Sequence, residues 1–136
     1  MMLRTGLLLL FSTLALADSA SDVLNVFTSA AESLVSDAAA SFLDSFDRNM
    51  PDYAALQENV KGLLAAYDVG STIEEVSDAG DDHKRTVELD WLLILTQKGA
   101  TNSAQQTRRQ IVKCTVERRG KQWKITALEP VDFFRY

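Results

Sequence analysis

The stretch IVKCTVERRGKQWKITALEP, residues Ile111–Pro130, decides the fold, because its pattern predicts two strands joined by a tight turn. Apolar residues alternate with polar ones on both sides of RRGKQ, and side chains at alternate positions of a strand share one face. Charged residues around a glycine are typical of such a turn. We therefore predict a hairpin whose second strand continues to Phe134. Its inward-facing side chains are expected to be Val112, Cys114, Val116, Trp123, Ile125 and Ala127.

Two further strands are predicted upstream of this hairpin. The segment KRTVELDWLLILTQK, residues 84–98, has one unbroken apolar face, whereas its other face becomes apolar only towards the end. Residues 70–77 predict a shorter first strand, while DAGDDH predicts a turn and GATNSAQQ a loop. Strands joined in this way predict an antiparallel meander. The apolar face of the longer strand consists of Val87, Leu89, Trp91, Leu93 and Leu95.

Two amphipathic helices are predicted before the strands. Apolar residues recur every three or four positions in residues 19–49 and again in residues 52–66, which places each set on one side of a helix. Pro51 separates the two helices, because proline disfavours helical angles in Met50 but is compatible with the first turn of a new helix. Each apolar stripe needs a partner surface, so we predict an α+β fold in which helices cover one face of the sheet. The stripes are Val23, Phe27, Ala31, Leu34, Ala38, Phe42 and Phe46, followed by Tyr53, Leu56, Val60, Leu63 and Leu64.

The first 17 residues predict a secretory signal peptide. Arg4 precedes the apolar run GLLLLFSTLALA, and the small residues of ALA at positions 15–17 suit a signal peptidase. The run is shorter than the roughly 20 residues that span a bilayer, and the polar segment DSASD follows it. We therefore expect residues 18–136 to form one domain, exported to the periplasm or the cell exterior, with no stable membrane span after cleavage. Retention of the N-terminal segment as an anchor is the alternative.

Charge and composition exclude several classes of protein. The chain has 14 basic and 19 acidic residues, and loss of Arg4 with residues 1–17 leaves 13 and 19, a formal charge of −6. Nucleic-acid binding needs a net basic face, so no such partner is expected. Cys114 is the only cysteine, which rules out an intramolecular disulfide. The sequence lacks a phosphate-binding loop and zinc-type ligand spacing, so no cofactor is predicted.

The order of two helices followed by strands that end in WKI resembles the nuclear transport factor 2-like superfamily. The segment RRGKQWKI, residues 118–125, is similar to the pattern of the last two strands in that superfamily. The resemblance extends from Val23 to Phe134, and the cystatin-like arrangement is a close architectural neighbour. It implies a strongly curved sheet wrapped around the helices, a pocket between them, and frequent dimerisation through the outer sheet face. Ketosteroid isomerase, scytalone dehydratase and SnoaL-like proteins share this cone-shaped fold; members isomerise, dehydrate or cyclise substrates, and others only bind.

Enzymes of the superfamily place a base in the pocket, and three residues are weak candidates here. Asp68 lies near the start of the first strand, where the resemblance to the ketosteroid isomerase group implies a general base, and Tyr53 and Tyr67 could face a pocket. The alternative is structural, with Asp68 closing the corner between helix and strand and both tyrosines packed at the edge of the core. His83 lies in the turn GDDHK, which we expect to be exposed, so neither a metal site nor a His/Asp pair is predicted. Cys114 is expected to be a buried thiol of raised pKa.

The outward face of the strands is predicted to carry a charge ladder beside an apolar patch. Glu88 and Asp90 are two positions apart, a spacing that suits acid/base chemistry, but oppositely charged residues on neighbouring strands explain them without catalysis. The other charged residues of this face are Arg109, Lys113, Glu117 and Lys124. Clustered exposed aliphatic residues indicate a dimer or partner surface. The predicted partner surface consists of Leu92, Ile94, Ile111 and Lys113.

Together these features favour a binding domain over an enzyme. The leading hypothesis is a non-enzymatic domain that binds a small apolar ligand or a protein partner, which includes a second copy of the chain. The first alternative is a SnoaL-like or ketosteroid isomerase-like enzyme that uses a pocket carboxylate or tyrosine. The second is a subunit of a cell-envelope assembly. The predicted pocket residues are Leu89, Trp91, Cys114 and Trp123.

Overall fold

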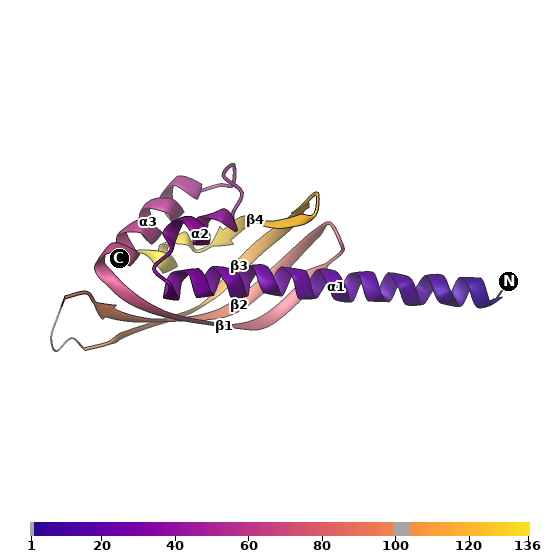
Figure 1. Ribbon diagram of the computed structural model, residues 1–136, viewed down its shortest axis with the longest axis horizontal. Coiled ribbons are helices and arrows are strands. Elements are labelled where there is room, and N and C mark those ends of the chain that lie inside the picture. Colours follow the sequence, from indigo (N-terminus) through magenta and orange to yellow (C-terminus); the bar gives the residue numbers. More distant parts are fainter. Residues whose placement is uncertain (1, 100–103) are drawn as a thin grey trace.

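The computed structural model describes the backbone of residues 2–99 and 104–136 and the side chains of residues 18–99 and 104–136. Within these residues, three α-helices precede four strands, and a short 3₁₀ helix follows the last strand (Figure 1). The elements are α1 (Met2–Val35), α2 (Ala39–Asp44), α3 (Tyr53–Ala66), β1 (Tyr67–Gly80), β2 (Lys84–Gln97), β3 (Gln106–Arg119), β4 (Gln122–Glu129) and η1 (Val131–Phe134).

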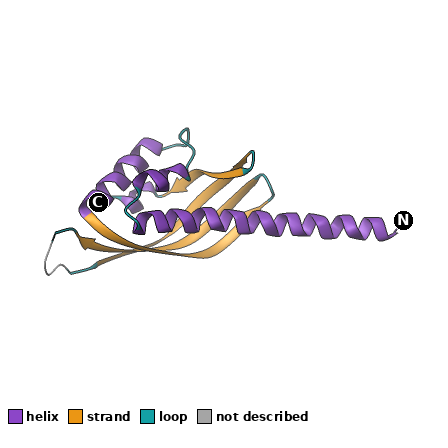
Figure 2. Ribbon diagram, in the orientation of Figure 1, coloured by secondary structure: helices purple, strands orange, loops and turns teal. Residues whose placement is uncertain are grey.

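The four strands form one antiparallel sheet in the order β1–β2–β3–β4, which confirms the predicted meander. The sheet curves around the helices, which lie against its inner face (Figure 2). The strict alternation of β2 explains this arrangement, because its apolar face lies wholly in the core. Val87, Leu89, Trp91, Leu93 and Leu95 are each at most 2% exposed. The α+β architecture expected from the sequence is therefore present.

The helices bury their predicted stripes against the inner face of the sheet. Val23, Phe27 and Leu34 of α1 are at most 1% exposed, and Leu56 and Val60 of α3 are fully buried. The α3 boundaries agree with the predicted second helix to within one residue. Helices with one apolar stripe are stable in such a position because the sheet supplies the partner surface.

The first helix was predicted to continue to Asn49, and this prediction is wrong. Asp37 has a φ of 58°, in the left-handed region. The amide of Asp37 donates to the carbonyl of Leu34, and the amide of Ala38 donates to the carbonyl of Ser33. These two bonds form a Schellman motif, which ends α1 and satisfies its last carbonyl groups. Because glycine usually holds this position, the aspartate concealed the end of the helix.

The last strand was predicted to run to Phe134, but β4 ends at Glu129. Pro130 has no N–H group for the ladder, and η1 follows it. Ala127 was expected to face inward and instead is only half-buried, whereas Leu128 is 4% exposed. The physical reason is a β-bulge: the register between β3 and β4 shifts, so that Thr126 is an extra residue and the faces exchange beyond it.

The first strand is longer than predicted, because β1 pairs with β2 from Tyr67 to Gly80. A bulge at Val76 and polar residues on an exposed edge interrupt the alternation that sequence reasoning requires. The side chains of the predicted signal peptide, residues 1–17, lie outside the described part of the structure. The signal peptide therefore stays a prediction, as does the start of the domain at Asp18. Among the residues that the structure describes, no helix is long and apolar enough to cross a membrane.

Candidate functional site

The interior between helices and sheet is filled by aromatic rings. Trp91 of β2 meets Phe134 of η1 edge to face, with ring centroids 5.2 Å apart, and Phe133 lies 6.4 Å from the same indole. Phe42 of α2 completes the cluster at 5.4 Å from Phe134. All four side chains are at most 2% exposed. The C-terminal segment thus occupies the space where the sequence predicted a pocket around Trp91.

Two polar contacts hold the C-terminal segment in the interior. The guanidinium of Arg108 donates through Nη1 to the carbonyl of Phe133 at 2.7 Å and also to the carbonyl of Arg135. The side-chain amide of Asn59 on α3 donates to the carbonyl of Val131 at 3.1 Å. Neither Arg108 nor Asn59 was predicted to have such a role, although the alternation Arg108–Gln110–Val112 places Arg108 on the inner face of β3.

The predicted pocket residues share the inner face of the sheet but are spread along it, since Trp91 lies opposite Gln110 of β3 whereas Trp123 lies opposite Arg118. Leu89 is fully buried and Cys114, opposite Val87 in the register, is 1% exposed, so both side chains face the core. Burial raises the pKa of the Cys114 thiol, as expected for a small apolar side chain rather than a nucleophile. Trp123 is 6% exposed and is the one of the four that borders an open cleft among the described residues. A pocket lined by Leu89, Trp91 and Cys114 stays a prediction.

The candidate bases are dispersed. Asp68 is exposed and precedes the buried Val69, so its side chain points away from the core. Tyr53 and Tyr67 are half-buried and pack against the edge of the core. The carboxylate of Asp68 therefore does not lie in the aromatic interior around Trp91, and a catalytic role of the two tyrosines stays a prediction.

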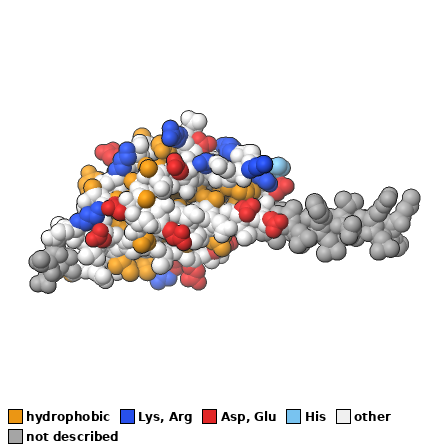
Figure 3. Space-filling view, in the orientation of Figure 1, with side chains coloured by type: hydrophobic (Ala, Val, Ile, Leu, Met, Phe, Trp, Pro, Cys, Tyr) orange, Lys and Arg blue, Asp and Glu red, His pale blue; other side chains and the backbone are white. Residues whose placement is uncertain are grey.

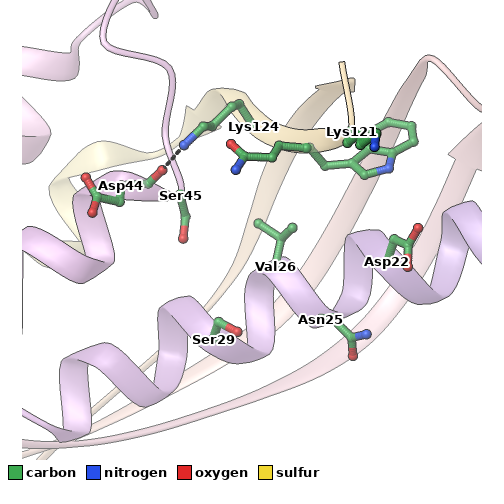
Figure 4. Close-up of a pocket in the computed structure, with 10 residues that line it drawn as sticks. Asp22, Asn25, Val26, Ser29, Asp44, Ser45, Lys121 and Lys124 are labelled. Atoms are coloured by element: carbon green, nitrogen blue, oxygen red, sulfur yellow. Dashed lines mark hydrogen bonds between the residues drawn. The ribbon is translucent and has the colours of Figure 1, made fainter. Parts of the chain in front are cut away.

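An open cleft lies between α1 and the start of β4, with a volume of about 460 Å³. Figure 4 shows Val26 pointing from α1 into the space below β4 and the chain after α2 at one end of it. Lys124 donates to the carbonyl of Asp44, which joins that end to the strand. The cleft is lined by Asp22, Asn25, Val26, Ser29, Asp44, Ser45, Lys121, Gln122, Trp123 and Lys124.

The outer face of the sheet combines an ion pair with exposed aliphatic residues. Arg109 donates from Nε and Nη2 to both carboxylate oxygens of Asp90, with a closest distance of 2.6 Å. These hydrogen bonds lower the pKa of Asp90 and raise that of Arg109. The predicted ladder is therefore present at this pair. Ile111 is 47% exposed, and a hollow of about 240 Å³ lies nearby between Glu74, Leu92 and Arg109.

The members of the predicted partner surface lie on this outer face as expected. Leu92 and Ile94 are half-buried, while Ile111 and Lys113 are exposed. In the register of β2 and β3, Asp90 lies opposite Ile111 and Leu92 lies opposite Arg109, so the Asp90–Arg109 pair crosses between Ile111 and Leu92. Ile111 on one side, and Leu92 with Ile94 on the other, form an apolar strip that the Asp90–Arg109 pair interrupts.

The turn between β1 and β2 carries the single histidine. The His83 side chain is 80% exposed, which confirms the expected exposure of this turn. Asp81 accepts hydrogen bonds from the amides of His83 and Lys84, which lower its pKa. In Figure 3 the pale blue His side chain lies among side chains of both charges, blue Lys and Arg and red Asp and Glu. The aspartate therefore has a structural role in closing the turn.

Comparison with solved structures places this fold among known proteins. A candidate scytalone dehydratase from Novosphingobium aromaticivorans superposes with a TM-score of 0.71 at 11% identity, over 82% of this chain and 85% of that chain. A type 2 hexachlorocyclohexane dehydrochlorinase gives 0.68 at 12% identity, over 86% of each chain. A nuclear transport factor 2-like protein of unknown function from Shewanella oneidensis gives 0.60 at 13% identity, over 80% of this chain and 95% of that chain.

These likenesses show the fold and nothing finer. No protein-family model matches the chain, and no curated protein matches it in sequence. The solved structures share the cone-shaped fold of the nuclear transport factor 2-like superfamily, and the present chain has that fold. The resemblance predicted from RRGKQWKI is thereby confirmed at the level of fold. Because such folds host both enzymes and binding proteins, function depends on the residues described above.

Proposed function

We propose that this chain, with its nuclear transport factor 2-like cone fold, is a non-catalytic, exported binding domain that engages a second copy of itself through the outer sheet face. The single observation that carries the non-catalytic part is the packing of Phe133 and Phe134 against Trp91. A substrate of this fold needs interior space, and here the chain's own rings fill it. Asp68, the leading candidate base, points away from that interior.

The outer face supports the binding part of the proposal. The exposed side chain of Ile111, together with half-buried Leu92 and Ile94 on the same outer face, leaves apolar area in water. Its contact with a copy of the same strip would remove that area from water, which is favourable by roughly 25 cal/mol per Å². The Asp90–Arg109 pair lies between Ile111 and Leu92, where its two charges already neutralise each other within the chain.

Native mass spectrometry of the protein purified from its own host tests the proposal. We expect a dimer of chains that begin after residue 17. The Ile111→Glu variant should dissociate at least about tenfold more readily, because it places a charge in the apolar strip. Val35→Glu is the matched control, since Val35 is similarly exposed but lies at the end of α1. A monomer of full precursor mass would contradict both the export and the dimer.

A small apolar ligand in the interior is the second possibility that the same measurement addresses. Such a ligand would have to displace Phe133 or Phe134, and would appear as added mass on each protein subunit. A dimer without added mass favours the outer face as the binding surface. An added mass that survives Ile111→Glu and disappears with Phe134→Trp would move the binding function to the interior.

A further inference from the structure

The outer edge of β4 is paired with another segment at one residue only, within the described part of the chain. The amide of Ile125 donates to the carbonyl of Ser45 at 2.9 Å, and the amide of Asp47 donates to the carbonyl of Ile125 at 2.9 Å. Phe46 and Ile125 thus form a parallel bridge. The short segment after α2 acts as a one-residue strand beside β4, which shows that this edge has the geometry for parallel pairing.

The same edge continues to Trp123 without such a neighbour among the described residues. Backbone groups of a strand point to alternate sides at successive residues, so the N–H and C=O of Trp123 point the same way as those of Ile125. They therefore face the cleft between α1 and β4, which Trp123 borders. An exposed row of strand N–H and C=O groups is a template for an added strand.

The cleft presents specific side chains to an added strand. Val26 on α1 supplies an apolar contact that is already half-buried against the core. Lys121 is exposed in the β3–β4 turn and makes no ion pair in the described part of the chain, whereas the ammonium of Lys124 is bound to the carbonyl of Asp44. Asp22 lies on the α1 side and disfavours a second acidic residue there.

We propose that this cleft binds an extended peptide by strand addition to β4 at Trp123, with an apolar side chain against Val26 and one acidic side chain against Lys121. The site is separate from the outer sheet face, so it does not depend on the proposed dimer. The occupant is a partner polypeptide. A cleft of about 460 Å³ accommodates a few residues in extended conformation, and the rest of the segment extends into solvent at the open end.

A random ten-residue peptide library displayed on phage, panned against the full chain, tests the proposal across many partner sequences at once. Ser29→Trp places a bulky ring in the cleft from an exposed α1 position and should reduce binding of the enriched peptides at least about tenfold. Thr28→Trp is the matched control, because Thr28 is exposed on the same helix but does not line the cleft. Lys121→Glu should reverse the preference from acidic to basic peptides, whereas Lys61→Glu on α3 should leave it unchanged.

Hydrogen exchange by NMR then locates the bound peptide. We expect the amide of Trp123 to exchange at least about tenfold more slowly with an enriched peptide bound, and methylation of the peptide's backbone nitrogens to abolish the effect. Failure of the library to yield a peptide that prefers the wild type over Ser29→Trp would overturn the proposal. So would protection of the outer-face strip around Ile111 in place of Trp123. Loss of dimerisation in Ile111→Glu with peptide binding intact would separate this site from the proposed function.

Discussion

The indole of Trp91 and the ring of Phe134 meet edge to face, with centroids 5.2 Å apart and planes at 86°. Aromatic pairs prefer this geometry because the positive edge of one ring faces the negative face of the other. The indole N–H donates to the hydroxyl of Ser71 at 2.9 Å, so the buried ring has a satisfied polar group. The contact joins the middle of β2 to the last turn of the chain and makes that turn part of the core.

Substitution of Phe134 by alanine should destabilise the fold by about 3–5 kcal/mol, the usual cost of a large-to-small change in a packed core. Phe134 is fully buried and contacts Trp91, Phe42 and Phe133. Chemical denaturation monitored by tryptophan fluorescence measures the change. Val35→Ala, at a position 55% exposed, is the control and should change stability by less than about 1 kcal/mol. A cost below about 1 kcal/mol for Phe134→Ala would show that the C-terminal turn is not part of the core.

The alternation of side chains predicted β2 and the hairpin partner β3 because each of these strands buries one face. In β2 and β3 the inward residues expected from the sequence, such as Trp91 and Val112, are fully buried. The predicted element boundaries and faces were wrong where a local backbone feature interrupts the periodic pattern of apolar residues. Thr126 is an extra residue that shifts the register of β4, and Asp37 adopts the left-handed conformation that ends α1. Neither threonine nor aspartate is specific to these conformations, so a single sequence does not predict them.

The candidate site was less predictable than the fold, because it depends on which segments meet. The sequence predicted that Phe133 and Phe134 end the last strand. In the structure they lie instead in the 3₁₀ turn after Pro130, and both rings are buried. The cleft beside Trp123 combines residues from α1, the segment after α2 and β4, which are far apart in the sequence. A residue on the outer face such as Ile111 was predictable, since exposure follows directly from strand alternation.

Arg85 and Asp78 form a buried ion pair, and removal of one partner should be strongly destabilising. Arg85 donates from Nε to Asp78 at 2.8 Å, and both side chains are at most 9% exposed. Arg85→Ala leaves an uncompensated carboxylate in the interior, so we expect a loss of about 3–5 kcal/mol in the free energy of unfolding. The double variant Arg85→Met with Asp78→Leu should recover most of that loss, because no charge stays buried. Equal stability of the single and double variants in urea would contradict this role of the pair.

Stability should fall in acid through carboxylates whose pKa is lowered in the folded state. The hydrogen bonds from Arg109 lower the pKa of Asp90 below the ordinary aspartate value of about 3.9. A lowered folded pKa contributes stability above the unfolded pKa, and this contribution is lost as the pH falls through the folded pKa. Urea unfolding midpoints measured from about pH 6 down to about pH 2 should therefore decline less steeply in Asp90→Asn.

Asp68→Asn is the matched control for this titration. Asp68 lies on the same outer face but makes no ion pair among the described residues. A parallel decline for Asp90→Asn and the wild type would refute the assignment of acid sensitivity to the Asp90–Arg109 pair.

Gly62 and Tyr136 are coupled across the C-terminal turn, and a double-mutant cycle should detect the coupling. A Cβ at Gly62 would clash with the ring of Tyr136, so alanine in α3 requires the ring to move. Glycine inside a helix is about 0.5–1 kcal/mol less favourable than alanine. Gly62→Ala should therefore stabilise the Tyr136→Ala variant by about that amount but give a smaller gain, or a loss, in the wild type. Ala65→Gly, exposed on the same helix, should cost the same in both backgrounds. A gain for Gly62→Ala that is equal in both would show that the Tyr136 ring, 65% exposed, does not rest on α3 in solution.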